Sequence, residues 1–100
     1  MQKVALVVRI VAKAGKEEEV RAFLAGAEPV ARAESFTPVW FALRTSSNVF
    51  WVVDAFADDA ARDRHLAGDI ARALMAKASE LLAEPPSIEK AEVLASVVRG

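Results

Sequence analysis

Three segments of the chain are apolar at almost every position, and no other feature constrains the fold as strongly. They are Val4–Val11 (VALVVRIV), Thr37–Arg44 (TPVWFALR) and Val49–Phe56 (VFWVVDAF). Their β-branched and aromatic residues predict strands. Because these segments do not alternate strictly between apolar and polar residues, we expect a sheet that is covered on both faces.

The polar segment Thr45–Asn48 has the length expected of a hairpin turn between the second and third of these strands. With an even-numbered turn, Arg44 should lie opposite Val49, and this register assigns each side chain to a face. One face is then expected to carry Thr37, Val39, Phe41 and Leu43 with Phe50, Val52, Asp54 and Phe56, and the other Trp40, Ala42 and Arg44 with Trp51, Val53 and Ala55.

Helical spacing of apolar residues, together with residues that start or end helices, predicts the remaining elements. A proline inside a helix removes a hydrogen bond, so a kink or a two-piece helix is expected where one occurs. The expected elements are a helix over Lys16–Glu34 with a kink or break at Pro29, a short helix to Leu66 capped by Asp58, a helix over Ile70–Ala83 between Gly68 and Pro85, and a final strand over Ser87–Val98.

The chain of 100 residues has the size of one domain, which we expect to span residues 1–100. Its helices suffice to cover only one face of the sheet. The hydrophobic fraction of 54% is also high for a single small domain. A second copy of the same chain is the simplest cover for the other face, so the sequence predicts a homodimer.

Composition argues against several classes of protein. Without cysteine the chain has no disulfide or thiolate chemistry, and its single histidine cannot complete a usual zinc site, so no metal is expected. A net charge of -1 with interspersed basic residues argues against nucleic acid as a partner. No run reaches the ~18 apolar residues that span a bilayer. The N-terminus lacks a secretory signal, so we expect a cytoplasmic protein with no membrane partner.

In chain order, the expected elements form two strand-helix-strand units, which predicts a ferredoxin-like α+β fold with a four-stranded antiparallel sheet. Motifs along this order resemble the antibiotic biosynthesis monooxygenase (ABM) domain family, especially its quinol monooxygenase-like members. These motifs are A-K-x-G-K-E-E-E-V (Ala12–Val20), the acidic Glu34 before a strand, T-P-V-W-F-A-L-R (Thr37–Arg44), F-x-x-x-D-A-F-x-D (Phe50–Asp58), R-H-L-A-G (Arg64–Gly68) and E-L-L-A-E-P-P-x-I-E (Glu80–Glu89).

The resemblance implies a ferredoxin-like chain that pairs sheet to sheet into a dimeric α/β barrel, with a pocket between the sheet and the helices of each chain. It also implies oxidation of phenolic or quinol-like substrates with O2 and no metal or flavin, so no cofactor is expected. His65 matches the family's common histidine, but a second histidine often found five residues later is Ile70 here. Haem-degrading relatives carry Trp where His65 stands, so haem breakdown is not expected.

His65 is the expected catalytic residue, because a histidine can take a proton near neutral pH. The alternative is a surface or capping histidine next to Asp69. Asp54 could orient His65 or act as a second base, or it could bind a cation or face a dimer seam. The candidate pocket residues are Asp54, Phe56, Trp40, Trp51 and Arg44, although core packing explains the aromatic residues and a carboxylate partner explains the arginine.

These observations favour a cofactor-independent monooxygenase that oxidises a small aromatic, phenolic or quinol substrate with O2. The competing hypothesis is a noncatalytic dimer of the same fold, which binds a small ligand or has only a structural role. Oxygen uptake with hydroquinones or anthrones would distinguish the two.

Overall fold

The computed structural model describes residues 1–99. Its elements are β1 (Val4–Val11), α1 (Glu17–Gly26), α2 (Glu28–Ala33), β2 (Val39–Arg44), β3 (Val49–Phe56), α3 (Asp59–Leu66), α4 (Asp69–Leu81) and β4 (Ser87–Glu92). The strands form one antiparallel sheet in the order β2-β3-β1-β4. This confirms the predicted ferredoxin-like α+β fold, and β1 and β3 have the predicted bounds.

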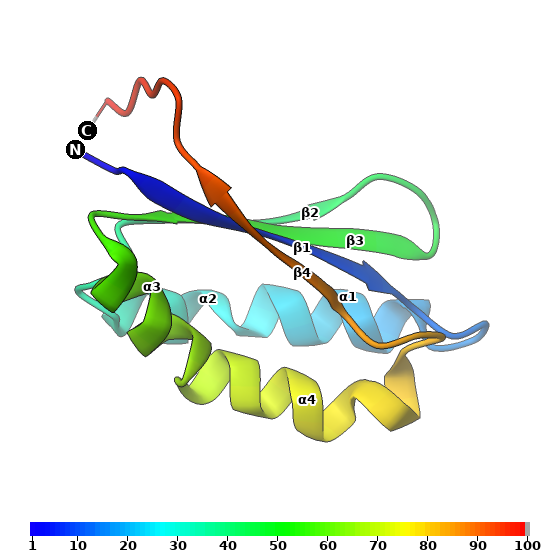
Figure 1. The fold of residues 1–100 in the computed structure, drawn as a ribbon. Helices are drawn as coiled ribbons and strands as arrows, with labels where there is room; N and C mark the ends of the chain where they lie inside the picture. The colour runs from blue at the N-terminus through cyan, green and yellow to red at the C-terminus, as the bar shows by residue number, and fades with distance from the viewer. Residues whose placement is uncertain (100) are drawn as a thin grey trace.

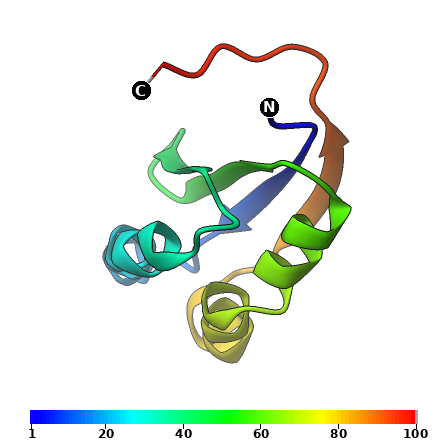
Figure 2. The same cartoon turned by 90° about the vertical axis from the view of Figure 1, so that its left-hand side faces the viewer.

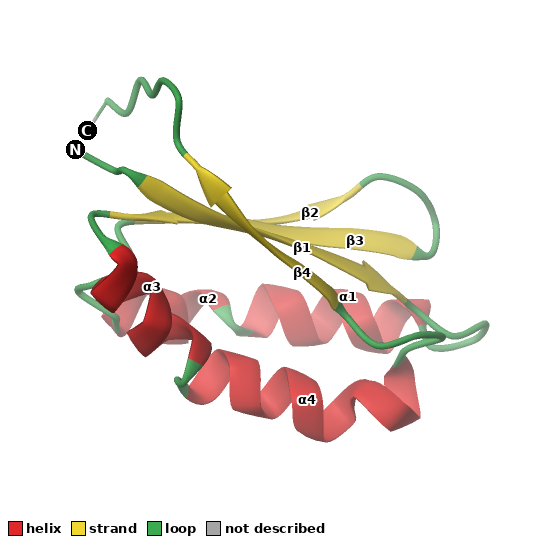
Figure 3. Ribbon diagram, viewed as in Figure 1, coloured by secondary structure: helices red, strands yellow, loops and turns green. Residues whose placement is uncertain are grey.

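The helices of the described chain all lie on one face of the sheet (Figures 1 and 3). Viewed after a quarter turn, the sheet curves above them, and the C-terminal segment runs over its opposite side (Figure 2). The core fills the space between the two layers. Its buried residues are Leu6, Val8, Ile10, Ala12, Val20, Leu24, Phe50, Val52, Phe56, Leu81 and Leu82.

Local chemistry explains where the helices begin and end. The predicted two-piece helix is confirmed, since α1 ends at Gly26 and Pro29 lies in the first turn of α2, where its missing N–H costs nothing. Asp58 caps α3 as predicted, its Oδ1 accepting a hydrogen bond from the Ala61 amide at 2.9 Å.

Arg62 anchors α3 against the sheet. Its guanidinium donates hydrogen bonds to the backbone carbonyls of Ala5 and Ala91, both at 3.3 Å, and pairs with Asp59 at 3.2 Å. A buried guanidinium with several partners holds its element firmly in place. The helix that carries His65 is therefore tied to β1 and to the end of β4.

The predicted register of the β2–β3 hairpin is wrong by one residue. Arg44 lies opposite Phe50 rather than Val49, because the Val49 carbonyl is used to accept the Thr45 amide at 3.0 Å and so belongs to the turn side of the hairpin. A shift of one residue moves every side chain of a strand to the other face. Trp40 consequently faces the helices, opposite Asp54 in the sheet.

The face of the sheet away from the helices is apolar and open in the single chain. Phe41 and Leu43 of β2 are 57% and 45% exposed, and the register places Trp51 and Val53 of β3 on the same face. Exposed aromatic and aliphatic side chains side by side on a sheet are typical of an interaction surface. The expectation of a sheet apolar on both faces is thus met, and within residues 1–99 no helix covers the second face (Figures 1 and 3).

The predicted final strand is too long at its C-terminal end. β4 is an edge strand that ends at Glu92. Glu92 lies opposite Val4, the first residue of β1, so the residues after Glu92 have no strand to pair with. Leu94 and Val97 beyond it are 88% and 78% exposed. The apolar second half of the predicted strand is an extended tail.

Within residues 1–99, the helices are too short or too polar to cross a lipid bilayer.

Candidate functional site

The one histidine of the chain is buried between the helices and the sheet. His65 lies in the last turn of α3 and is 5% exposed. The Phe56 ring, at the end of β3, packs against the imidazole with 5.3 Å between the ring centroids. The interpretation of His65 as a surface or capping histidine beside Asp69 is therefore wrong.

Two carboxylates contact the imidazole on opposite sides. His65 Nδ1 lies 2.7 Å from Glu34 Oε1, and His65 Nε2 lies 3.0 Å from Asp54 Oδ2. Both partners are also withdrawn from solvent, with side chains 11% and 1% exposed. We call these three residues the carboxylate–histidine network.

The two ends of the network differ in quality. The contact between His65 and Glu34 has the geometry of a hydrogen bond. The contact between His65 and Asp54 is close enough for an ion pair but lacks the direction of a hydrogen bond. Both Asp54 oxygens are therefore buried without a hydrogen-bond donor. Asp54 lies in the middle of the sheet, opposite Leu6 of β1 and Trp40 of β2. A buried carboxylate in such a place needs a positive charge beside it, and the protonated imidazole of His65 supplies one.

Burial alone lowers the pKa of His65, but the contacts with Asp54 and Glu34 and their negative charges outweigh it and raise the pKa above the usual 6.5. The physical cause is that an imidazolium can donate from both ring nitrogens, whereas a neutral imidazole can donate from only one. The network therefore holds a proton more firmly than an isolated histidine does.

The segment between α2 and β2 holds Glu34 in place. The Thr37 hydroxyl donates to Glu34 Oε1 at 2.8 Å and lies 3.4 Å from His65 Nδ1. Gly68 leaves room on the other side, since a Cβ at this position would lie 3.2 Å from Glu34 Oε2 and 3.2 Å from the His65 carbonyl. A larger residue here would push Glu34 Oε2 or the His65 carbonyl back by a few tenths of an ångström, so position 68 favours glycine for space rather than for its backbone angle.

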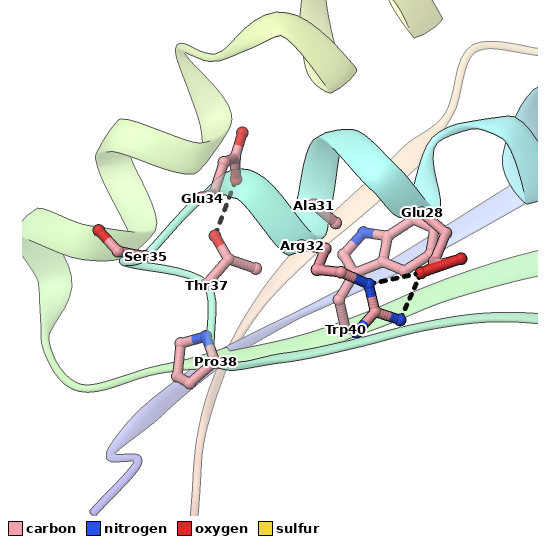
Figure 4. A pocket seen from close by; sticks show the side chains of 8 residues that line it. All are labelled: Glu28, Ala31, Arg32, Glu34, Ser35, Thr37, Pro38 and Trp40. Carbon is pink, nitrogen blue, oxygen red and sulfur yellow. Dashed lines mark hydrogen bonds and ion pairs between the residues drawn. The ribbon is translucent and has the colours of Figure 1, made fainter.

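A cavity of about 380 Å³ opens beside the network, between α2 and the start of β2 (Figure 4). Its volume is in the range that accommodates a small ligand. Trp40 supplies an aromatic wall, and an ion pair between Arg32 and Glu28 lies at its edge. The residues that line it are Glu28, Ala31, Arg32, Glu34, Ser35, Thr37, Pro38 and Trp40.

The structure brings together only some of the predicted site residues. His65, Asp54 and Phe56 are in mutual contact or adjacent, and Trp40 lines the cavity next to them. Trp51 is on the opposite face of the sheet, where its Nε1 donates to the Thr45 hydroxyl at 2.9 Å.

Arg44 lies apart from this cavity, at the hairpin end of the sheet. It donates to the Ser47 carbonyl at 2.7 Å, stacks over the Phe50 ring and lies 3.7 Å from Glu18. Arg44 lines a separate cavity of about 140 Å³. The expected pocket thus does not include Trp51, because the observed register places it on the face of the sheet opposite Trp40. Arg44 is on the same face as Trp40 but at the other end of β2.

Sequence analysis missed Glu34 and Thr37 as site residues. Glu34 lies 31 residues from His65 in the sequence, and Thr37 lies 28 residues from it. No local sequence pattern reports contacts between residues so far apart. The one signal was an acidic residue just before a strand. Among residues 1–99 no group of three or more potential ligands could hold a metal ion, since the two carboxylates contact opposite ring nitrogens and do not converge on one point.

Comparisons with known proteins identify relatives mainly through structure. No protein-family model and no curated protein matches the chain. A crystal structure of a protein of unknown function from Nitrosomonas europaea is 53% identical over 100% of this chain and 97% of its own, with a TM-score of 0.97.

More distant structures share the fold. A "Putative antibiotic biosynthesis monooxygenase" from Nitrosomonas europaea is 14% identical over 92% of this chain and 99% of its own, with a TM-score of 0.82. Another protein of that name, from Caulobacter crescentus, is 22% identical over 94% and 92%, with a TM-score of 0.71. At these identities the similarity shows the fold alone, and the fold is that of the predicted family.

Proposed function

Because the chain belongs to the same family as the Nitrosomonas europaea protein of unknown function and has the fold of the antibiotic biosynthesis monooxygenases, we propose that it is a cofactor-independent monooxygenase. Its substrate is a small aromatic, phenolic or quinol compound that reacts with O2. The observation that carries this proposal is the buried His65, held between Asp54 and Glu34 beside a cavity with an aromatic wall.

The chemistry requires the substrate to supply every electron. An anthrone-type substrate loses a proton to give an enolate, which transfers electrons to O2 far more readily than the neutral molecule does. A CH2 carbon then becomes a carbonyl, one oxygen atom enters the product, and the other leaves as water. The protein has to provide a base, a partner for the developing charge and a dry cavity, and the carboxylate–histidine network offers the base.

Oxygen uptake with a hydroquinone and with an anthrone tests the proposal. We expect uptake by the wild-type protein and a loss of about 100-fold or more in the His65→Gln variant, because the network then lacks the imidazole that can hold the substrate proton. Asp63→Asn, a change at an exposed residue on the same helix, is the matched control and should keep the wild-type rate. Uptake no faster than that of heat-denatured protein, with both substrates, would favour the noncatalytic alternative.

A homodimer is part of the same proposal, since the open face of the sheet exposes Phe41 and Leu43. Two copies packed face to face would remove these side chains from water and complete the barrel. We expect the wild-type protein to sediment as a dimer at micromolar concentration and Phe41→Asp to sediment as a monomer. Ile88→Asp, at a residue that is 45% exposed on the helix-facing side of β4, should remain dimeric. A monomeric wild-type protein would contradict the dimer.

A further inference from the structure

Resting on this proposed function, we propose that Glu34 is the catalytic residue that takes the proton from the substrate hydroxyl group, and that His65 is a positioning residue that receives this proton behind it. The substrate is an uncharged hydroxyaromatic compound. Sequence reasoning had assigned proton removal to the histidine itself.

Access to the cavity distinguishes the two residues. Glu34 lines the cavity, whereas His65 does not. Both imidazole nitrogens of His65 are already in contact with carboxylate oxygens. A substrate hydroxyl would have to displace Glu34 or Asp54 to reach either nitrogen, so the imidazole cannot be the first proton acceptor in this arrangement.

Glu34 has one committed and one free oxygen. Oε1 accepts from the Thr37 hydroxyl and contacts His65 Nδ1, while Oε2 has no hydrogen bond within residues 1–99 and lies beside Gly68. A carboxylate that lines a cavity and has one oxygen without a hydrogen bond is suited to accept a hydrogen bond and then a proton. Gly68 keeps the space beside this oxygen clear.

The proton has a defined route and resting place. When His65 is neutral, the substrate O–H bond breaks, its electron pair stays on the substrate oxygen, and the proton passes to Glu34. The carboxyl group of Glu34 then rotates so that its protonated oxygen faces His65, and the proton moves to Nδ1, which Oε1 contacts at 2.7 Å in the structure. Asp54, 3.0 Å from Nε2, stabilises the imidazolium that results. The charge of the network changes from -2 to -1, and the substrate becomes an anion ready to react with O2.

The charges around the cavity define the substrate class. Two carboxylates, Glu28 and Glu34, line it, and the one guanidinium, that of Arg32, is paired with Glu28 through Nε at 2.8 Å (Figure 4). Among residues 1–99, the cavity lining holds no unpaired cation to receive a substrate carboxylate or phosphate. The Trp40 ring supplies a flat apolar wall instead, which suits a neutral aromatic ring.

Steady-state oxygen uptake over a range of pH tests the assignment on the full protein. We expect Glu34→Gln to lower kcat by about 100-fold or more with KM within about threefold of wild type. In the wild type, kcat should rise with pH as the network loses its proton, because the charges facing His65, Asp54 from β3 and Glu34 from the segment before β2, raise its pKa. In the His65→Gln variant this rise of kcat with pH should disappear. In the Asp63→Asn variant the dependence of kcat on pH should match that of the wild type. Retention of most of kcat in Glu34→Gln overturns the assignment.

Binding of 4-fluorophenol, followed by 19F NMR, separates failure of the assignment from failure of the proposed function. Loss of a hydrogen bond to a carboxylate predicts binding about 10-fold weaker or more in Glu34→Gln and unchanged in Asp63→Asn. Glu34-dependent binding without oxygen uptake by the wild type would overturn the monooxygenase and support the contact between Glu34 and the hydroxyl. Oxygen uptake with binding that is independent of Glu34 would overturn the contact and support the monooxygenase.

Discussion

The His65→Ala variant is expected to be less stable than the wild type by about 3–5 kcal/mol, and a second substitution, Asp54→Asn, is expected to restore part of that loss. Removal of the imidazolium leaves the Asp54 carboxylate, 1% exposed, without any opposite charge. Solvation of a buried unpaired charge is very costly. In the wild-type background Asp54→Asn should instead destabilise, because it removes a partner of the imidazolium.

Urea unfolding at 25 °C of the wild type, both single variants and the double variant measures this change of sign. A double-mutant cycle isolates the coupling between the two residues from the loss of packing that each truncation causes. If Asp54→Asn destabilises the wild type and the His65→Ala variant by the same amount, the 3.0 Å contact between His65 and Asp54 contributes no net coupling energy.

The Phe56→Ala variant is expected to lose about 3–5 kcal/mol of the free energy of unfolding. Phe56 is 0% exposed at the end of β3, and it contacts both the main core and the imidazole of His65. Truncation would leave a cavity that the closely packed strand and helix cannot close. It would also open the apolar side of His65 to water, so the two effects add at one place.

Chemical unfolding of Phe56→Ala is compared with that of Met75→Ala, in which a side chain that is 56% exposed on α4 is truncated. The Met75 change should alter the free energy of unfolding by no more than about 0.5 kcal/mol. A loss below about 1 kcal/mol for Phe56→Ala would mean that the ring does not support the site.

Much of the fold follows from local chemistry along the chain. The apolar runs Val4–Val11 and Val49–Phe56 are strands over the residues predicted, the proline at 29 separates two helices, and the carboxylate of Asp58 caps the next one. Each of these features depends on residues that are near one another in sequence. Periodicity and capping rules report such features well.

Features that depend on distant contacts could not be predicted in the same way. The register of the β2–β3 hairpin depends on whether Val49 pairs with β2 or accepts a turn hydrogen bond, and the residue types Thr45–Asn48 allow both. The end of β4 depends on where β1 begins. Neither is encoded in the segment itself.

The candidate site shows the same division. His65 was identifiable as the one histidine of the chain, and Asp54 as a charge within an apolar strand. Glu34 was identifiable only as an acidic motif residue before a strand, because its role arises only when the fold brings it to the imidazole. The residue that links the buried network to the cavity was therefore the one to which sequence analysis gave no role in the site.

The titration of His65, followed by NMR of its ring nitrogens and carbons, tests the central claim most directly, since the chain has only one histidine. The account predicts a midpoint above 6.5 in the wild type and a lower midpoint in both Glu34→Gln and Asp54→Asn, because each variant removes one negative neighbour. A midpoint at or below 6.5 that neither substitution changes would contradict the carboxylate–histidine network.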